Sequence, residues 1–431
     1  HWGGENRVYG CVFDDRGSVV TNRHQAISTI DGNAWGDYSW NLVKRTRQQG
    51  LMGAAVAEEN EIYIDSCATN AFGIKPTGKA GKPASVRYNH IYGIGEHPVG
   101  IAMFGVYPPD SFVTANEVEV KCTRSGTEYG YTGSACFRTT WGADNLHVDL
   151  NEFTAHADVY GGKVAKARCV RVGLPHFTPK GGTEEIRDAR GFFLGNVIKA
   201  VGRNGAKAGA ICVVCLNESP NLIFYGNDVY STWANVLLGD EYGHAGGYPK
   251  FVGNTFGRVG EAPAYRTIYQ QRGRIPATGV FLGNTYEKGA SRESVELGET
   301  GEVVFQSFVW ISVADGEGKP VADARVVVSD SSGNPVHQDT TVSEETNATL
   351  LADGERLRAS RPYDSTHRGY AGLLTVEAGE VAVVLTREVV TADGRKAAGP
   401  YTVTATKEGY KPATKKVDVA ETGRVEIVLE E

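Results

Sequence analysis

A short motif, an apolar pair followed by Gly-Asn, recurs in this chain at nearly constant intervals. It occurs as Phe193-Leu-Gly-Asn196, Phe224-Tyr-Gly-Asn227, Phe251-Val-Gly-Asn254 and Phe281-Leu-Gly-Asn284, with steps of 31, 27 and 30 residues between successive asparagines. Asn tolerates the left-handed backbone conformation of a tight bend, and Gly beside it avoids a side-chain clash. Self-similarity at such a period is typical of architectures in which each repeat packs on its neighbours. We therefore expect one coil of a β-solenoid per motif.

Earlier in the chain the same period is carried by asparagines without the preceding glycine. The series is Asn6, Asn33, Asn60, Asn89, Asn116 and Asn145, with steps of 27, 27, 29, 27 and 29 residues. An alternating apolar and polar run follows these asparagines, which indicates a strand with one buried face. A coil of this length holds about three short strands and their turns, so roughly ten coils fill residues 1 to 290.

The middle of each interval supplies the third strand of a coil. The candidates are Gly100–Val106, Gly133–Thr139, Ala210–Leu216, Asn235–Asp240 and Arg266–Gln270. Longer inserts rich in Gly, Pro and polar residues separate these strands, namely Lys75–Pro83, Tyr107–Ala115 and His176–Arg190. Such inserts are typical of loops that project from one side of a solenoid and carry function.

The asparagine series and the apolar strands together resemble the right-handed parallel β-helix proteins of the pectate-lyase-like superfamily. In that family stacked asparagines at one bend form a ladder of side-chain amides that bond to one another and to the backbone. The resemblance covers residues 1–295. It implies an all-β fold, a right-handed parallel β-helix of about ten coils, and it says little about function.

The pattern changes near Val303, where alternating strands of another kind begin. Gly318-Lys-Pro-Val321 opens one such segment, and Lys407-Glu-Gly-Tyr410 lies in a hairpin near the end. These motifs resemble the carboxypeptidase-regulatory-like, transthyretin-type β-sandwich. We expect a small sandwich over residues 300–431 with an insertion around 340–400. In the family such modules are non-catalytic spacers or surface attachments.

Charge and cysteine content exclude several classes of function. Lys and Arg number 44 against 51 Asp and Glu, for a formal net charge of −7, so a basic nucleic-acid footprint is not expected. No apolar run is long enough for a membrane span. Seven cysteines cannot all pair, and most lie in apolar strands, so we expect small buried thiols rather than a disulfide framework.

The chain begins with His1 in what looks like the middle of a repeat. We expect an upstream segment to have been removed, or a partner chain to cover the first coil, because an open solenoid end exposes unpaired strand edges. Self-association or contact with other surface-protein chains is therefore one expected kind of partnership.

The densest group of chemically active residues follows the fourth candidate strand. Asp240 and Glu241 could supply acid and base groups or ligands for a cation, His244 could shuttle a proton, and Arg266 one interval later could clamp a carboxylate. The alternative is a glycine-rich surface turn with solvated charges.

A second group suits the binding of substrate. Alternation places His156 and Asp158 on one face of a strand, and Arg138 lies one coil earlier. The alternative is an ordinary hydrogen-bonded pair on the surface. No complete set of metal ligands is evident in the sequence.

Extracellular β-helix proteins mostly handle polysaccharides, so the resemblance implies a secreted or cell-surface protein that binds an extracellular polysaccharide. Cleavage would be of the lyase type, with a Lys or Arg base and commonly a bound calcium ion, or of the glycosidase type, with facing carboxylates. The polygalacturonase motifs are not intact, since Gly243-His-Ala and Arg274-Ile-Pro replace Gly-His-Gly and Arg-Ile-Lys. A non-enzymatic structural or adhesive protein, or a fibre subunit, is the alternative.

Overall fold

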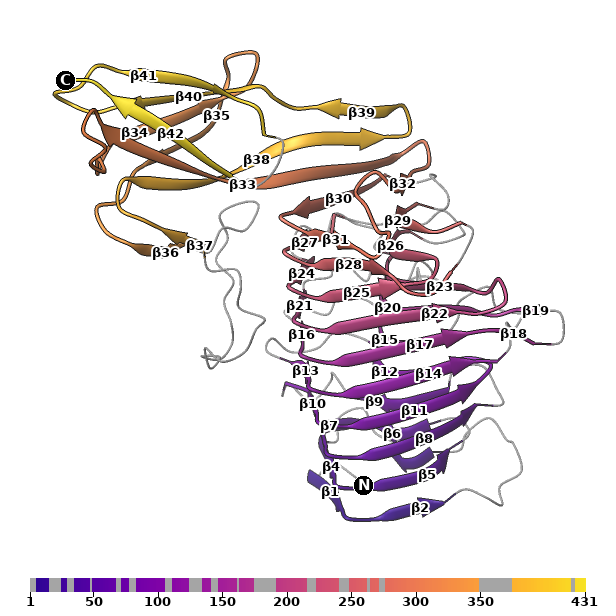
Figure 1. Ribbon diagram of the computed structural model, residues 1–431. Coiled ribbons are helices and arrows are strands. Elements are labelled where there is room, and N and C mark those ends of the chain that lie inside the picture. The colour runs from indigo at the N-terminus through magenta and orange to yellow at the C-terminus, as the bar shows by residue number, and fades with distance from the viewer. Residues whose placement is uncertain are drawn as a thin grey trace, which may run out of the picture. The chain divides into compact units, whose positions relative to one another are not determined.

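The fold was analysed in a computed structural model of the chain (Figure 1). It describes residues 5–14, 25–28, 35–46, 49–66, 71–76, 83–104, 111–123, 134–140, 146–160, 163–173, 191–214, 222–239, 248–261, 264–270, 276–348, 374–419 and 423–431. Within these ranges every regular element is a β-strand, so the predicted all-β class is confirmed. None of the described residues forms a helix that is long and apolar enough to cross a membrane.

The chain winds through three parallel sheets in turn, which confirms the predicted β-helix of about ten coils. The first strand of each coil lies in sheet A: β1 (Glu5–Tyr9), β4 (Trp35–Ser39), β7 (Ala54–Glu58), β10 (Ser85–Arg87), β13 (Phe112–Thr114), β16 (Leu146–Asp149), β21 (Gly191–Leu194), β24 (Leu222–Tyr225), β27 (Lys250–Val252) and β30 (Ala277–Leu282). Neighbouring strands of a sheet come from successive coils (Figure 1).

The second strand of each coil lies in sheet B. This ten-stranded sheet contains β2 (Val12–Asp14), β5 (Leu42–Thr46), β8 (Glu61–Ser66), β11 (His90–Gly95), β14 (Glu117–Cys122), β17 (Glu152–Ala157), β22 (Val197–Gly202), β25 (Asp228–Ser231), β28 (Thr255–Arg258) and β31 (Thr285–Glu287). A small antiparallel pair, β18 (Val159–Tyr160) and β19 (Lys163–Val164), follows β17.

The third strand of each coil lies in sheet C, which also has ten strands. They are β3 (Gln25–Ser28), β6 (Gln49–Met52), β9 (Ala71–Lys75), β12 (Pro98–Phe104), β15 (Ala135–Thr140), β20 (Lys166–Val172), β23 (Lys207–Val213), β26 (Ala234–Leu238), β29 (Arg266–Tyr269) and β32 (Val295–Glu296). All five third strands predicted from the sequence overlap strands of this sheet. The segment Tyr107–Ala115, in contrast, is not all loop, because it includes β13 of sheet A.

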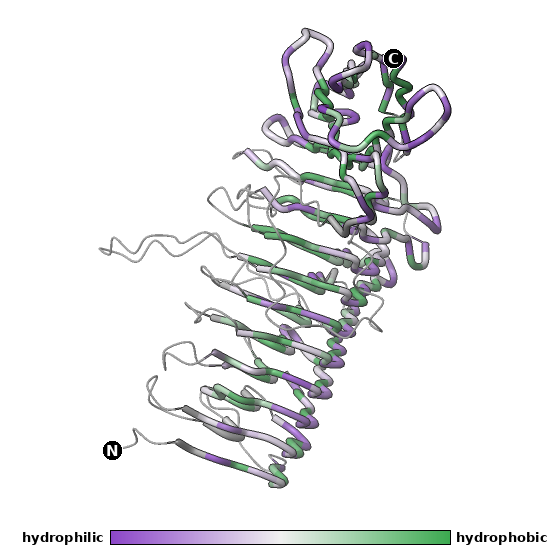
Figure 2. The backbone as a smooth tube through the Cα atoms, turned by 90° about the vertical axis from the view of Figure 1, so that its left-hand side faces the viewer, coloured by the Kyte–Doolittle hydropathy of each residue, from purple (hydrophilic) through white to green (hydrophobic). Residues whose placement is uncertain are grey.

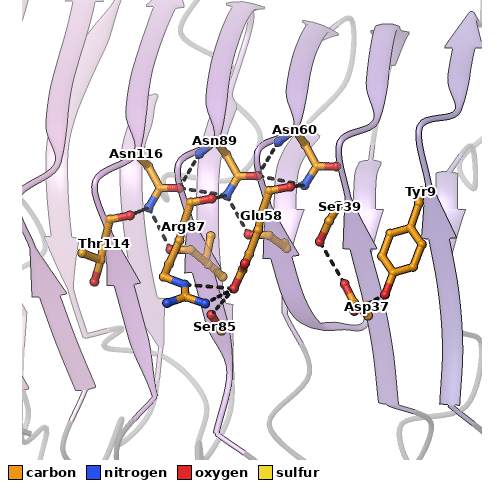
Figure 3. Close-up of polar contacts among 12 residues, drawn as sticks. Tyr9, Asp37, Ser39, Glu58, Asn60, Ser85, Arg87, Asn89, Thr114 and Asn116 are labelled. Carbon is orange, nitrogen blue, oxygen red and sulfur yellow. Dashed lines mark hydrogen bonds and ion pairs between the residues drawn. The ribbon is translucent and has the colours of Figure 1, made fainter. Parts of the chain in front are cut away.

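An asparagine ladder runs along the bend between sheets A and B, as the resemblance implied (Figure 3). In each rung the side-chain oxygen of one asparagine accepts hydrogen bonds from the backbone N–H and the side-chain amide of the asparagine one coil earlier. From Asn60 to Asn89 these distances are 3.0 and 2.8 Å, and from Asn89 to Asn116 they are 3.0 and 2.8 Å. The same amide also donates to a backbone carbonyl, which for Asn89 is that of Ala57 at 2.8 Å. The ladder therefore satisfies polar groups that the stacked coils bury.

The ladder differs from the predicted series at several positions. After Asn116 its next asparagine is Asn151, not Asn145, and Asn41 belongs to it although the series omitted this residue. Asn6 lies inside β1, where it pairs with Gly36 of the next coil, rather than at the bend. Asn33 and Asn145 lie outside the described residues.

The left-handed residue at this bend is the one before each asparagine, not the asparagine itself as we predicted. It is glycine in the last four coils, at Gly195, Gly226, Gly253 and Gly283, and in the first coil Gly10 has the same conformation before Cys11. In the coils between, it is Trp40, Glu59, Tyr88, Ala115 and Leu150, with φ between 53° and 57°. A left-handed conformation costs a residue with a β-carbon about 1–2 kcal/mol, so these coils hold strained backbone that the ladder and the sheets keep in place.

Stacked apolar side chains fill the interior of the coils. The rings of Phe193 and Phe224 stack with centroids 4.5 Å apart, so the recurring motif supplies one aromatic ring per coil as well as the bend. Apolar stretches accordingly recur from one coil to the next in Figure 2. Cys122, Cys136 and Cys169 are fully buried free thiols, which confirms the expected role of these cysteines.

The C-terminal region forms a small domain of two mainly antiparallel layers with a shared apolar core. Its strands are β33 (Gly301–Asp315), β34 (Arg325–Ser329), β35 (Pro335–Thr340), β36 (Thr346–Ala348), β37 (Leu374–Val376), β38 (Glu380–Thr391), β39 (Gly394–Ala397), β40 (Tyr401–Thr406), β41 (Ala413–Val417) and β42 (Gly423–Leu429). One layer contains β33, β38, β39 and β42, of which β42 runs parallel to β33, and the other has the order β35-β34-β40-β41. Strands β38 and β39 come from the stretch that we expected to be an insertion.

By internal contacts the chain divides into two compact units. The first comprises His1–Pro249, Asn254–Thr278 and Thr285–Gly301, and the second comprises Lys250–Gly253, Gly279–Asn284 and Glu302–Glu431.

Candidate functional site on the outer face of sheet C

The outer face of sheet C carries the arginines and aromatic rings that could hold a ligand. Its orientation follows from Phe137 in β15, whose ring lies 6.1 Å from that of Phe153 in sheet B and 5.8 Å from that of Phe193 in sheet A. Phe137 therefore points into the coil. Because successive side chains of a strand alternate, its neighbour Arg138 points outward.

Arg138 is directly opposite Arg171 of β20 in the register of the sheet. Both side chains are buried, with residue exposures of 6% and 5%. Neighbouring strands lie about 4.8 Å apart, so the two guanidinium groups leave the sheet side by side. Burial and the positive charge of Arg171 lower the pKa of Arg138 to about 9, which still leaves this group protonated at neutral pH.

Aromatic and apolar side chains continue this outer row beyond Arg171. The register runs from Arg171 through Cys212, Leu237 and Tyr269 to Glu296. Trp233, directly before β26, packs in one apolar cluster with Cys212 and Leu237. The face therefore combines adjacent cations with a buried aromatic surface.

Two further cations lie over the indole ring of Trp233. The guanidinium carbon of Arg168 is 5.0 Å from its ring centroid, and the ammonium nitrogen of Lys207 is 5.1 Å away. Such cation–π contacts stabilise positive charge in partly desolvated positions. They hold Arg168 against the same surface that Arg138 and Arg171 occupy.

Arg266 lies on this face, as one of the four residues predicted to be catalytic. In register it follows Arg168, Gly209 and Ala234 along a second outer row. Its Nε donates to Glu296 at 2.7 Å, and its Nη1 donates to the carbonyl of Tyr265 at 2.8 Å. Arg138 and Arg266 thus share one face, separated by three strands of the sheet.

The other three predicted catalytic residues, Asp240, Glu241 and His244, lie outside the described residues. In the sequence they come directly after β26 and Gly239. Their role stays a prediction.

The predicted substrate-binding group is divided between two sheets. Arg138 belongs to sheet C, whereas His156 lies on the outer face of sheet B, where its Nε2 is 3.2 Å from a carboxylate oxygen of Glu119. Asp158 follows β17 and accepts a hydrogen bond of 2.8 Å from the side-chain amide of Asn204. His156 and Asp158 therefore do not form one site with Arg138 on the face of a single sheet.

A calcium site is not provided by the part of the chain that the structure describes. Within it, no group of three or more His, Cys, Asp or Glu side chains could hold a metal ion. Calcium binding by the predicted carboxylates Asp240 and Glu241 stays an expectation from the sequence.

Sequence reasoning missed Arg168, Arg171, Trp233 and Tyr269. A usable signal was present in Arg168-Cys-Val-Arg171, one coil after Arg138, because two arginines in an otherwise apolar strand are unusual. Recognition of β20 as a third strand would have placed Arg171 beside Arg138.

Comparison of the sequence with models of known protein families and with curated proteins found no match, so the fold and the arrangement of these side chains are the basis for assigning a function.

Proposed function

We propose that this protein is secreted or exposed at the cell surface and binds an acidic polysaccharide along the outer face of sheet C. The observation that carries the proposal is the pair Arg138 and Arg171 on neighbouring strands, beside Arg168 and Trp233. Guanidinium groups match carboxylates in shape and charge, and the cation–π contact with Trp233 holds Arg168 on the same face.

The charge of this face favours a polymer of uronic acids over a neutral glycan. Burial, and then repulsion by the adjacent Arg171, disfavour the charge on Arg138 and lower its pKa. A carboxylate placed between the two guanidinium groups reduces that repulsion and gains charge-assisted hydrogen bonds. A neutral sugar offers no such compensation.

Arg138 also favours a lyase reaction over hydrolysis. A guanidinium with a pKa of about 9 loses its proton far more readily than an ordinary arginine, so it is better suited to act as a general base. In β-elimination the base removes the proton from the carbon next to the uronate carboxylate. The bond between the neighbouring carbon and the glycosidic oxygen then breaks, a carbon–carbon double bond forms, and the leaving oxygen takes up a proton.

The test is to incubate the purified protein with polygalacturonate, alginate and neutral dextran. Binding is measured by affinity electrophoresis, and the unsaturated product of elimination is followed by its ultraviolet absorbance. We expect binding to the two uronic-acid polymers and not to dextran, and loss of both binding and product in Arg138→Gln. Arg138→Lys, which keeps the charge, controls for folding together with circular dichroism.

Two results would oppose the proposal. If a folded Arg138→Gln variant binds polygalacturonate as tightly as the unchanged protein, the outer face of sheet C is not the binding face. Release of reducing ends without an unsaturated product would indicate a glycosidase, and the Asp240→Ala and His244→Ala variants would then test the carboxylate and imidazole predicted from the sequence.

A structural or adhesive role is the second candidate, and exposed aromatic side chains near the first coils favour it. Trp40 is 58% exposed and Tyr9 is 42% exposed, and their rings lie 5.5 Å apart. Tyr88 is 57% exposed on the same bend. Exposed apolar rings are typical of surfaces that bind other proteins. Sedimentation of the protein over a range of concentrations, compared with Trp40→Ser, tests whether these rings support self-association.

A further inference from the structure

The outer face of sheet B carries a second arrangement of charged and aromatic side chains, separate from sheet C. Its inward residues are fully buried, as at Val118 and Val120 of β14, so Glu117, Glu119 and Lys121 point outward. The same alternation applies to the other strands of this sheet. Outward side chains that are opposite each other in register therefore form rows that cross the strands from coil to coil.

One of these rows begins with two tyrosines. Tyr63 of β8 and Tyr92 of β11 are opposite each other in register, and their ring centroids are 6.3 Å apart. Tyr63 donates its hydroxyl hydrogen to Glu61, and its side chain is exposed to solvent. Two neighbouring phenol rings on an open face form a platform on which sugar rings can stack.

Basic side chains follow in the next coils, near the ends of the strands. Lys121 of β14 is opposite His156 of β17 in register, and Lys199 lies on the next strand, opposite Thr154. Arg203, just after β22, donates its backbone N–H to the carbonyl of Ala157 and so lies at the same end of the sheet.

Two carboxylates lie near these cations. Glu119 is 3.2 Å from His156, and Asp158 follows β17 and accepts a hydrogen bond from Asn204. Burial lowers the pKa of His156, and the positive charges of Arg203, Lys121 and Lys199 lower it further against the opposing effect of Glu119. Within the described ranges Lys121, Lys199 and Arg203 form no ion pair. Lys121, Lys199 and Arg203 outnumber the carboxylates of Glu119 and Asp158, so this end of the face keeps a net positive charge.

We infer that the outer face of sheet B is a second binding surface for a uronic-acid polysaccharide, with sugar rings on Tyr63 and Tyr92 and carboxylates at Lys121, Lys199 and Arg203. The inference takes its ligand class from the proposed function but uses none of the residues of sheet C. Its physical basis is charge complementarity between a row of carboxylates and cations that are two coils apart.

The spacing of the coils suits such a ligand. Each coil advances the face by about 4.8 Å, close to the length of one pyranose residue in an extended chain. A polysaccharide aligned with the solenoid therefore presents about one sugar to each coil. Lys121 and Lys199 are two strands apart, roughly 10 Å, so they can reach carboxylates on alternate sugars.

The test compares two sets of charge reversals in the full chain. Lys121→Glu combined with Lys199→Glu changes the proposed surface, and Lys44→Glu is the matched control, because Lys44 is an exposed lysine on β5 of the same sheet, three strands from Lys121. The probe is an oligogalacturonate of eight sugars, and affinity is measured by calorimetry. We expect the double variant to weaken binding at least about tenfold and Lys44→Glu to leave it unchanged.

Arg138→Gln is measured alongside, so that failure of the sheet B surface can be told from failure of the proposed function. Weaker binding in the double variant with sheet C intact supports the inference. Full binding in the double variant together with loss in Arg138→Gln overturns it and leaves the proposed function standing. Equal losses in Lys44→Glu and the double variant also overturn it, since they indicate attraction by overall charge. Equally tight binding of dextran sulfate overturns the choice of carboxylate as the group recognised.

Discussion

The asparagine ladder allows one stability prediction to be worked out bond by bond. In the substitution Asn151→Ala the backbone stays and the amide is removed from the middle of the ladder. The side-chain oxygen of Asn151 accepts two bonds from Asn116, both 2.9 Å. Its amide donates to Asn196 and to the carbonyl of Val113, both at 2.9 Å, and to the carbonyl of Asp149 at 3.1 Å. Five buried bonds at about 1 kcal/mol each, three of which share the two amide hydrogens, predict a loss of about 3–5 kcal/mol in the free energy of unfolding.

The measurement is urea denaturation followed by circular dichroism, combined with hydrogen exchange of the backbone amide of Asn116. That amide donates to Asn151 in the native ladder, so its protection should fall in Asn151→Ala. The control is Asn204→Gly, which removes an exposed amide at a turn where φ is 53° and a glycine is tolerated. A loss below about 1 kcal/mol, with the Asn116 amide still protected, would refute the view that the ladder couples the coils.

Three further predictions concern strain, thiols and pH. Glu59→Gly should raise the free energy of unfolding by about 0.5–1 kcal/mol, because glycine removes the left-handed strain but adds chain entropy to the unfolded state; a lower denaturation midpoint would contradict this. Cys136 should resist a thiol reagent in the native protein because burial raises its pKa, whereas the partly exposed Cys11 should react, and labelling followed by mass spectrometry would show any early modification of Cys136. The pKa of His156 is lowered in the folded protein, so below about pH 6.5 the unfolded chain binds more protons than the folded chain does. The free energy of unfolding should therefore decrease as the pH falls through this range. His156→Gln should flatten that part of the stability profile, and an unchanged slope would show that His156 does not contribute.

The repeat could be read from the sequence because Gly-Asn recurs at the same bend in four successive coils. Where a non-glycine residue takes the left-handed position, as Leu150 does before Asn151, the motif disappears and Asn145 was chosen instead. In the ladder, it is the side-chain amide of asparagine that links neighbouring coils, whereas the left-handed backbone conformation belongs to the residue before it.

The candidate site was harder to predict because distance along the chain does not show which sheet a residue joins. Arg138 and His156 are 18 positions apart and lie on different sheets, whereas Arg138 and Arg171 are 33 positions apart and adjacent in register. Only the assignment of each strand to a sheet brings the two arginines together. Alternation predicted that His156 and Asp158 share one face of a strand, whereas β17 ends at Ala157, before Asp158.

The left-handed corner residues have a consequence for how this solenoid can be modified. Positions 40, 59, 88, 115 and 150 form a column of non-glycine residues, one per coil, directly before the ladder asparagines. Trp40 and Tyr88 show that large side chains fit there while more than half exposed. Dyes or spin labels attached at these positions would sit at regular steps of about 4.8 Å along the axis. The corner therefore provides a set of evenly spaced attachment points that leaves the interior of the coils untouched.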